Sequence, residues 1–391
     1  MTTPSSRAQR SDLDVAVSTA GALLHDADTE RLPALVLGGS GYVGGELLRL
    51  LAGHPGLRPA VVVSDSKPGV AVEEAFPHLA GALDGLTFSG RDALPRILGE
   101  HPRMAAFGAA PHGAAAPLVA ELFDAAAGAG GDVAMVDLSA DFRFADAAAW
   151  ERVYGHPHGA PELLAGFFCA VPELAPTAEL APSVELGYSV PPRAIAHPGC
   201  FTTATLLAAV PLVRAGLVEP SITVVAVTGS TGAGRTPTST THHPERRSTL
   251  FAYSPLQHRH QPEMEALAAA AGAPASFHFV PQAGPFARGI HATLVMRPTN
   301  GATADDARAA LATFYADAPF IDVLAAPPRL QDVVGTNRCR IAVAADRDTL
   351  VAFSVIDNLV KGAAGGAIQW MNRLLSYPET AGLTTPGLGW L

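Results

Sequence analysis

A cysteine that follows a Pro-Gly turn is the residue of this chain best suited to nucleophilic chemistry. Cys200 comes directly after Pro198-Gly199 and opens an apolar segment with a helical pattern. Unpaired backbone N–H groups and the positive end of a helix dipole favour the thiolate form of a cysteine in that position. Since thiolates attack acyl carbons, we interpret Cys200 as a catalytic nucleophile; the alternative is a small residue of the core.

Two histidines in one short segment are candidates for proton transfer. His258 and His260 lie two residues apart, and Glu263 follows them. An imidazole that titrates near pH 7 can both donate and accept a proton. We favour His258 as the acid–base and His260 as a substrate contact, with Glu263 at the substrate site orienting a ring. No spacing among the 14 histidines matches a zinc motif, so we expect no metal site.

Two arginines could bind the anionic part of a substrate. Arg143 follows a strand pattern, where it would bind a phosphate through two N–H groups or pair with Asp141 at the surface. Arg235 closes the glycine-rich segment that begins at Gly229. That segment predicts either an anion-binding nest or a flexible hairpin loop.

A glycine-rich turn predicts a dinucleotide site. Its three glycines recur every third residue between the apolar run 32–37 and a helical pattern, which is the position such a turn needs. Glycines allow backbone N–H groups to approach a pyrophosphate, and the following helix start neutralises part of its charge. The predicted cofactor-binding residues of the turn are Gly38, Ser40, Gly41, Tyr42, Val43 and Gly44.

The residues after the next strand pattern leave the choice of cofactor open. Asp65 would accept hydrogen bonds from a ribose 2′-hydroxyl and repel a 2′-phosphate. Its neighbours Ser64, Ser66 and Lys67 could instead bind that phosphate. A solvated turn is the remaining alternative.

Strand patterns alternate with helical patterns in the first half of the chain, which predicts a doubly wound parallel sheet. After Cys200 the strand patterns are of another kind and predict a mixed or antiparallel sheet. We therefore expect an α/β fold with a Rossmann-type domain and an α+β catalytic domain. The expected divisions are an N-terminal extension (1–30), a dinucleotide domain (31–198 and 354–391) and a catalytic and oligomerisation domain (199–353). A helix with Thr303 as N-cap is expected from 304 to 316, and another from 357 to 375.

Composition narrows the class of protein. Of 391 residues 48% are hydrophobic and 16% charged, and the net charge is −10. No basic cluster suggests nucleic acid or an anionic membrane as partner. No long apolar segment predicts a membrane span, and three scattered cysteines suggest a reducing compartment. We expect a cytoplasmic protein.

Many motifs, in order from about residue 34 to the C-terminus, resemble the N-acetyl-γ-glutamyl-phosphate reductase family, which is related to aspartate-semialdehyde dehydrogenase. They are GGSGYVGGE (38–46), FPHL (76–79), PHG (111–113), VDLSADFR (136–143), VPEL (171–174), HPGC (197–200), GSTGAGR (229–235), QHRHQPE (257–263), FARGI (286–290) and IDNLVKGAAG (356–365).

The resemblance implies an NADPH-dependent reductase that converts N-acetyl-γ-glutamyl phosphate to the semialdehyde through a cysteine thioester, in arginine biosynthesis. It implies that Asn358 meets the nicotinamide end of NADP and that the enzyme is a homo-oligomer, a dimer or a tetramer. The substrate would be a small acyl phosphate. Gly362, Gly365 and Gly366 indicate close backbone approach to the cofactor or the sheet, or plain packing.

The chain departs from the family pattern in two places that bear on function. His197 stands where asparagine is usual, and Asp65 where arginine often occurs. The run THHPER (241–246) is similar to relatives that reduce a carrier-protein-bound aminoadipyl or glutamyl phosphate, and other relatives use an N-succinyl substrate. A non-catalytic nucleotide sensor is the alternative outside enzymes.

Overall fold

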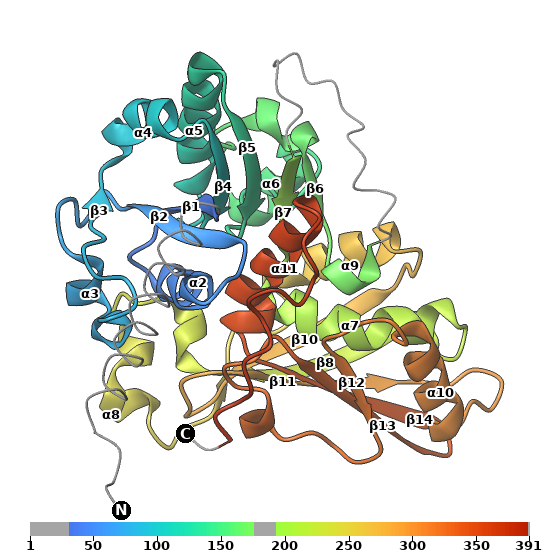
Figure 1. Cartoon of the computed structure of the whole chain (residues 1–391). Coiled ribbons are helices and arrows are strands. Elements are labelled where there is room, and N and C mark those ends of the chain that lie inside the picture. Colours follow the sequence, from blue (N-terminus) through green and yellow to red (C-terminus); the bar gives the residue numbers. More distant parts are fainter. Residues whose placement is uncertain (1–30, 176–192, 390–391) are drawn as a thin grey trace, which may run out of the picture.

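Short buried runs that alternate with helices form the first sheet. The computed structural model describes residues 31–175 and 193–389 (Figure 1). This sheet is parallel throughout, in the order β3-β2-β1-β4-β5-β7-β6, and confirms the expected Rossmann-type arrangement. Its strands are β1 (Leu32–Leu37), β2 (Leu57–Val63), β3 (Phe88–Ser89), β4 (Arg103–Gly108), β5 (Asp132–Asp137), β6 (Phe167–Cys169) and β7 (Arg193–Ala196).

Helices cover both faces of this sheet because its strands are apolar on both sides. In β1, Ala34 and Val36 share one core cluster with the helices α2 and α11, whereas Leu35 and Leu37 share another with α4 and α5. The helices of this part are α2 (Tyr42–Ala52), α3 (Val72–Ala75), α4 (Leu94–Glu100), α5 (Ala115–Ala129), α6 (Ala147–Tyr154) and, from the C-terminal end of the chain, α11 (Gly365–Leu374).

The second sheet is mixed, in the order β12-β13-β14-β11-β8-β10-β9. The pairs β8–β10 and β12–β13 are parallel and the others antiparallel. Its strands are β8 (Ser221–Thr228), β9 (Phe251–Ala252), β10 (Ser276–Ala283), β11 (Ile290–Met296), β12 (Ile321–Leu324), β13 (Cys339–Asp346) and β14 (Thr349–Ile356).

One face of the second sheet packs on a central helix, α7 (Cys200–Arg214), which is buried from Phe201 to Leu212. The other helices of this part are α8 (His243–Arg246), α9 (His260–Ala270) and α10 (Ala304–Phe314). The expected N-cap of α10 is confirmed, since Thr303 and Asp306 form a reciprocal capping box. Along β8, alternate residues are buried on the α7 side and exposed or half-buried on the other.

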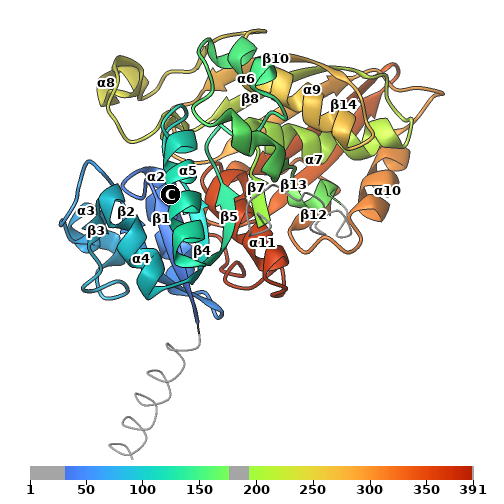
Figure 2. The same cartoon turned by 90° about the horizontal axis from the view of Figure 1, so that it is seen from above.

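The C-terminal helical segment differs from the single helix expected over 357–375. It begins with a π-helical turn, η9 (Val360–Ala364), and continues as α11. In two views at right angles α11 lies beside the first sheet (Figures 1 and 2), and its apolar residues join the core of β1 and α2. The domain boundary expected at residue 354 falls inside β14, because this strand pairs along its whole length with β13 and ends in the second sheet.

No helix in residues 31–175 and 193–389 is both long and apolar enough to cross a lipid bilayer. The expected N-terminal extension, residues 1–30, lies outside the described residues.

Candidate active site

The glycine turn lies between β1 and α2, as its spacing predicts. Gly38 has a φ of +68°, and a Cβ atom there would lie 2.5 Å from the backbone of Ala110. At Gly44 a Cβ atom would lie 2.3 Å from the carbonyl oxygen of Gly39, so helix and turn pack backbone against backbone. At Gly41, by contrast, a Cβ atom would meet nothing within 4 Å. Gly41 is the N-cap of α2 and provides no side-chain cap, which leaves the helix start open to a ligand.

Three serine side chains meet beside this turn. The hydroxyl of Ser64, after β2, donates to the hydroxyl of Ser40 at 3.0 Å and lies 3.1 Å from that of Ser66. Asp65 is paired with Arg91, and Lys67 is half-buried in the same turn. The predicted cofactor residues of the two loops therefore lie together at the carboxyl ends of β1 and β2.

Cys200 is the first residue of α7, and it is half-buried. Its N-cap, Gly199, has no side chain, and a Cβ atom there would lie 2.5 Å from Nε2 of His260. From the other side Gly362 of η9 packs on Cys200: a Cβ atom on Gly362 would lie 2.7 Å from Cβ of the cysteine. The close approach of Gly362 is thus made to the cysteine.

A buried carboxylate caps the start of α7. Oε1 of Glu263, on α9, accepts the N–H of Gly199 at 2.6 Å, and Oε2 pairs with Arg143 at 3.2 Å. Glu263 is fully buried, so its charge is compensated by the guanidinium and the N–H group. Glu263 orients the turn before the cysteine, and neither histidine ring is its hydrogen-bond partner among the described residues.

Arg143 is also held on every side. Its Nε donates to the carbonyl oxygen of His197 at 3.1 Å, and one terminal nitrogen to that of Leu138 at 2.9 Å. The alternative surface pair with Asp141 does not form, because Asp141 is buried and accepts the N–H groups of Gly113 and Ala116. The structure instead makes Arg143 the counter-ion of Glu263.

The two histidines lie together at the start of α9, with ring centroids 4.7 Å apart and nearly perpendicular planes. The backbone N–H of His260 donates to Nδ1 of His258 at 3.1 Å, which assigns the ring proton of a neutral His258 to Nε2. Burial, together with the nearby charge of Arg259, lowers the pKa of His258 to about 4, so the ring is neutral at pH 7. Burial lowers the pKa of His260 as well, and its Nδ1 has no partner among the described residues.

The expectation that Cys200 rests as a thiolate is wrong. Burial raises the pKa of its thiol to about 11, although Arg143 and the N–H group of Phe201 act in the opposite direction. The helix start does favour the anion, but desolvation of a half-enclosed sulfur outweighs it. At pH 7 the free enzyme therefore holds Cys200 as a thiol, and His258 and His260 as neutral imidazoles.

Two predicted residues, Arg235 and Asn358, hold loops at the junction between the two parts of the molecule. Arg235 donates to the carbonyl oxygens of Ser40 at 3.0 Å and Ala75 at 2.8 Å, which fixes its loop to the glycine turn. Asn358 accepts the N–H of Gly289 at 2.6 Å and donates to the hydroxyl of Thr231 at 3.0 Å. Asn358 thus holds together two loops that border the cofactor end.

An ion-pair network around Arg288 also connects the two parts of the molecule. Arg288 donates to buried Glu46 of α2 at 2.9 Å and to buried Asp357 at 3.0 Å. Burial acts to raise the pKa of Glu46, but the hydrogen bonds from Arg288 and Arg49 lower it below its usual range. The cofactor helix and the segment before η9 are therefore fixed to one guanidinium.

Sequence reasoning missed several residues around the histidines. Tyr253 stacks edge-on with His258 at 5.6 Å, and Arg259 lies over the ring of Tyr154 at 5.9 Å. Arg259 also contacts His112 at 3.2 Å and has no carboxylate partner among the described residues. His112 and Arg259 stand inside the motifs PHG (111–113) and QHRHQPE (257–263), and this is the one signal that could have indicated them.

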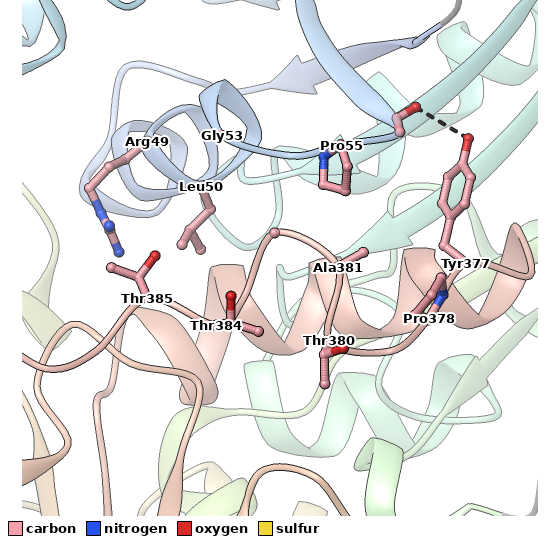
Figure 3. A pocket seen from close by; sticks show the side chains of 12 residues that line it. Arg49, Leu50, Gly53, Pro55, Tyr377, Pro378, Thr380, Ala381, Thr384 and Thr385 are labelled. Carbon is pink, nitrogen blue, oxygen red and sulfur yellow. Dashed lines mark hydrogen bonds between the residues drawn. The ribbon is translucent and has the colours of Figure 1, made fainter.

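A groove near the C-terminal tail is a separate feature. It has a volume of about 670 Å³ and lies between the end of α2 and residues 377–385 (Figure 3). The hydroxyl of Tyr377 donates to the carbonyl oxygen of Gly56 at its edge. None of the predicted site residues lines it.

Comparison with protein families identifies both parts of the chain. Residues 33–178 match the semialdehyde dehydrogenase NAD-binding domain, and residues 200–358 match the semialdehyde dehydrogenase dimerisation domain. Among solved structures, aspartate semialdehyde dehydrogenase II of Vibrio cholerae aligns with a TM-score of 0.64 at 16% identity, over 88% of this chain and 98% of that one. The enzyme of Candida albicans with NADP aligns with a TM-score of 0.62 at 16% identity, over 88% and 98%. At this identity the likeness concerns the fold.

Curated relatives are much more similar in sequence. The N-acetyl-γ-glutamyl-phosphate reductase of Pseudomonas entomophila is 44% identical over 359 residues, which cover 90% of this chain and 98% of the relative. That of Pseudomonas aeruginosa PAO1 is 42% identical with the same coverage. The chain belongs to the N-acetyl-γ-glutamyl-phosphate reductase family.

Proposed function

We propose that the chain reduces N-acetyl-γ-glutamyl phosphate with NADPH to N-acetyl-glutamate 5-semialdehyde and phosphate, as a step of arginine biosynthesis. The observation that carries this is the position of Cys200, at the start of α7 between the two histidines' turn and η9. The 44% identical relative bears the name of this activity.

The residues at the edge of the first sheet fit a dinucleotide. The uncapped start of α2 and the open space at Gly41 suit a pyrophosphate, and the hydroxyls of Ser40 and Ser64 suit a ribose. Lys67 and Asn358 complete the residues that we assign to NADP. When bound, the cofactor supplies a hydride to the acyl carbon; the chain supplies all other groups.

Cys200 attacks the acyl carbon of the substrate, and phosphate leaves as the thioester forms. The thiol proton must be removed in this step, and His260 is able to accept it, since its ring is neutral and its Nδ1 has no partner among the described residues. After hydride addition, the oxygen of the thiohemiacetal carries negative charge. The Nε2–H of His258 can hydrogen-bond this oxygen, and release of the aldehyde expels the sulfur, which regains as a thiol the proton that His260 accepted.

We assign four residues to the substrate site, each with a different role: His260, Arg143, Arg235 and Glu263. Arg143 and Glu263 neutralise each other, so their contribution is to hold Gly199 and the cysteine in place. Arg235 is fixed to the cofactor turn, where it orders the loop that faces both ligands. His260 packs on Gly199, the N-cap of α7.

We further propose a cytoplasmic homo-oligomer, with residues 31–198 and the segment after β14 as its cofactor domain and residues 199–356 as its catalytic and oligomerisation domain. The open face of the second sheet supports this, because half-buried Val351 and Phe353 of β14 lie on it beside exposed Val295 of β11. Apolar side chains on an uncovered sheet face favour association.

The test is a reverse assay with phosphate and NADP⁺ on three aldehydes: N-acetyl-glutamate, N-succinyl-glutamate and carrier-bound semialdehydes. We expect turnover of the N-acetyl compound, and none after Cys200→Ser, whereas NADP⁺ binding persists. A preference for either other aldehyde would reassign the substrate. Turnover by the Cys200→Ser variant would exclude the thioester chemistry.

A further inference from the structure

An acidic residue stands where the proposed NADPH would place its 2′-phosphate. Asp65 follows β2 by two residues, at the position from which a carboxylate normally binds the two ribose hydroxyls and repels a phosphate. This inference rests on the proposed function, because it asks how a chain with Asp65 can select the phosphorylated cofactor.

Arg91, from the turn after the neighbouring strand β3, forms an ion pair with Asp65. It begins η2 (Arg91–Ala93), which one residue separates from β3, and β3 pairs with β2 so that Ser89 lies opposite Val63. The turns after the two strands therefore lie side by side. The backbone N–H of Arg91 donates to Oδ1 of Asp65 at 3.2 Å and its Nε to Oδ2 at 2.7 Å, and a terminal nitrogen also donates to Oδ2.

The guanidinium retains capacity for a further anion. Of its five N–H groups, two bind Asp65 and one binds Glu121 at 3.3 Å. Both the arginine and the aspartate are about half exposed, with side-chain accessibilities of 44% and 45%, so a ligand can reach them. Asp65 and Glu121 both pair with Arg91.

Hydroxyl groups connect this ion pair with the glycine turn. Ser66, next to Asp65, lies 3.1 Å from the hydroxyl of Ser64, which in turn donates to Ser40. A phosphate at this point would meet hydroxyl donors on one side and a guanidinium on the other, which is the donor set that phosphate groups prefer.

We propose that Arg91 determines the preference for NADP: it cancels the charge of Asp65 and, with the serine hydroxyls, holds the 2′-phosphate. The sequence signal for a 2′-hydroxyl is thereby overridden by a residue from another strand.

The experiment measures binding without acyl substrate, by calorimetric titration with NADP⁺, NAD⁺, 2′,5′-ADP and 5′-AMP. For Arg91→Ala we expect the affinity for NADP⁺ and for 2′,5′-ADP to fall by about tenfold or more, since a charge-assisted contact to phosphate is lost. The affinities for NAD⁺ and 5′-AMP should stay the same or rise, because Asp65 becomes free to accept the 2′-hydroxyl.

Two further variants sharpen this test. Arg96→Ala is the matched control, because Arg96 is an exposed arginine on α4 whose partner is Glu100, and all four affinities should be unchanged. Asp65→Asn should weaken NAD⁺ binding and leave NADP⁺ binding intact or tighter. The loss at Arg91→Ala should shrink at high salt, as expected for an exposed charge.

An unchanged ratio of NADP⁺ to NAD⁺ affinity in Arg91→Ala would overturn the proposal, and so would an equal loss for both cofactors. A wild-type enzyme that binds NAD⁺ more tightly would overturn it as well. Binding is measured without the acyl substrate. The role of Arg91 can therefore be judged even if the enzyme does not turn over N-acetyl-glutamate semialdehyde.

Discussion

The cofactor end and the cysteine end of the site differ in how their charges are held. At the cofactor end, Asp65 and Arg91 are both about half exposed, and the hydroxyl groups of Ser64 and Ser66 flank Asp65 in its turn. At the cysteine end, Glu263 is fully buried and Arg143 nearly so, with side-chain accessibilities of 0% and 9%. An exposed pair contributes little to stability and can exchange partners, whereas a buried pair is costly to break.

This difference assigns the two ends different tasks. The exposed pair can turn toward a ligand and select it, as the proposed role of Arg91 requires. The buried pair fixes the backbone at Gly199, so that the sulfur of Cys200 starts each cycle in one position. Exposed, adaptable side chains would thus select the cofactor, whereas enclosed side chains position the nucleophile.

After Cys200→Ser, the largest effect should come from His258→Asn. Asparagine retains an oxygen that can accept the N–H of His260, so the turn should persist while the Nε2–H donor is lost. We expect kcat to fall by about 100-fold or more, the range typical of a lost acid–base group. NADP⁺ affinity, measured by titration, should remain within about twofold of wild type. An unchanged kcat would remove His258 from the chemistry.

The reactivity of Cys200 toward iodoacetamide should increase steeply with pH. With a thiol pKa of about 11, the thiolate fraction rises about tenfold per pH unit from pH 7 to pH 10. Mass spectrometry after timed alkylation gives the rate, and Cys200→Ser provides the background from buried Cys339 and half-buried Cys169. A rate plateau that begins below pH 8 would instead indicate a resting thiolate.

Glu263→Gln should show that the buried ion pair contributes more to stability than an exposed one. The amide keeps the shape and can still accept the N–H of Gly199, but buried Arg143 loses its counter-ion. We expect the free energy of unfolding in urea to fall by about 3 kcal/mol. The control is Glu100→Gln, which removes the exposed partner of Arg96 and should cost less than about 1 kcal/mol. Equal losses would contradict the comparison.

The smallest change in stability is expected at the glycine turn. An alanine at Gly41 meets open space, so the free energy of unfolding should change by less than about 0.5 kcal/mol while NADP⁺ affinity falls. An alanine at Gly44 would lie 2.3 Å from the carbonyl oxygen of Gly39 and should destabilise the fold by about 2 kcal/mol. A Gly41→Ala variant with normal NADP⁺ affinity would show that the ligand does not approach there.

Local patterns predicted what depends on neighbours in sequence. The run 32–37 forms β1 with those bounds, and the capping box at Thr303 begins α10. The two-sheet architecture followed from the change of strand pattern after Cys200. The motif order pointed to the family before any contact was known.

What escaped prediction depends on residues that meet only in the folded chain. Arg143 and Glu263 are separated by 120 positions, and nothing near either residue indicates the other. Arg91 and Asp65 are 26 positions apart and meet because β3 adds to β2. The thiol pKa of Cys200 was misjudged because the helix start is visible in the sequence while the burial of the sulfur is not.

The π-helical turn η9 makes two distant contacts depend on a single residue insertion. A π turn is an α-helix with one extra residue, and such turns are frequent at functional sites. Deleting one residue would rewind the segment and rotate what precedes the deletion by about 100°. Gly362 would then turn away from Cys200, and Lys361 from its partner Glu173, 2.5 Å away. The length of this turn is therefore constrained as well as its residue types, and a shortened version should lose the contact behind Cys200 and a buried charge pair together.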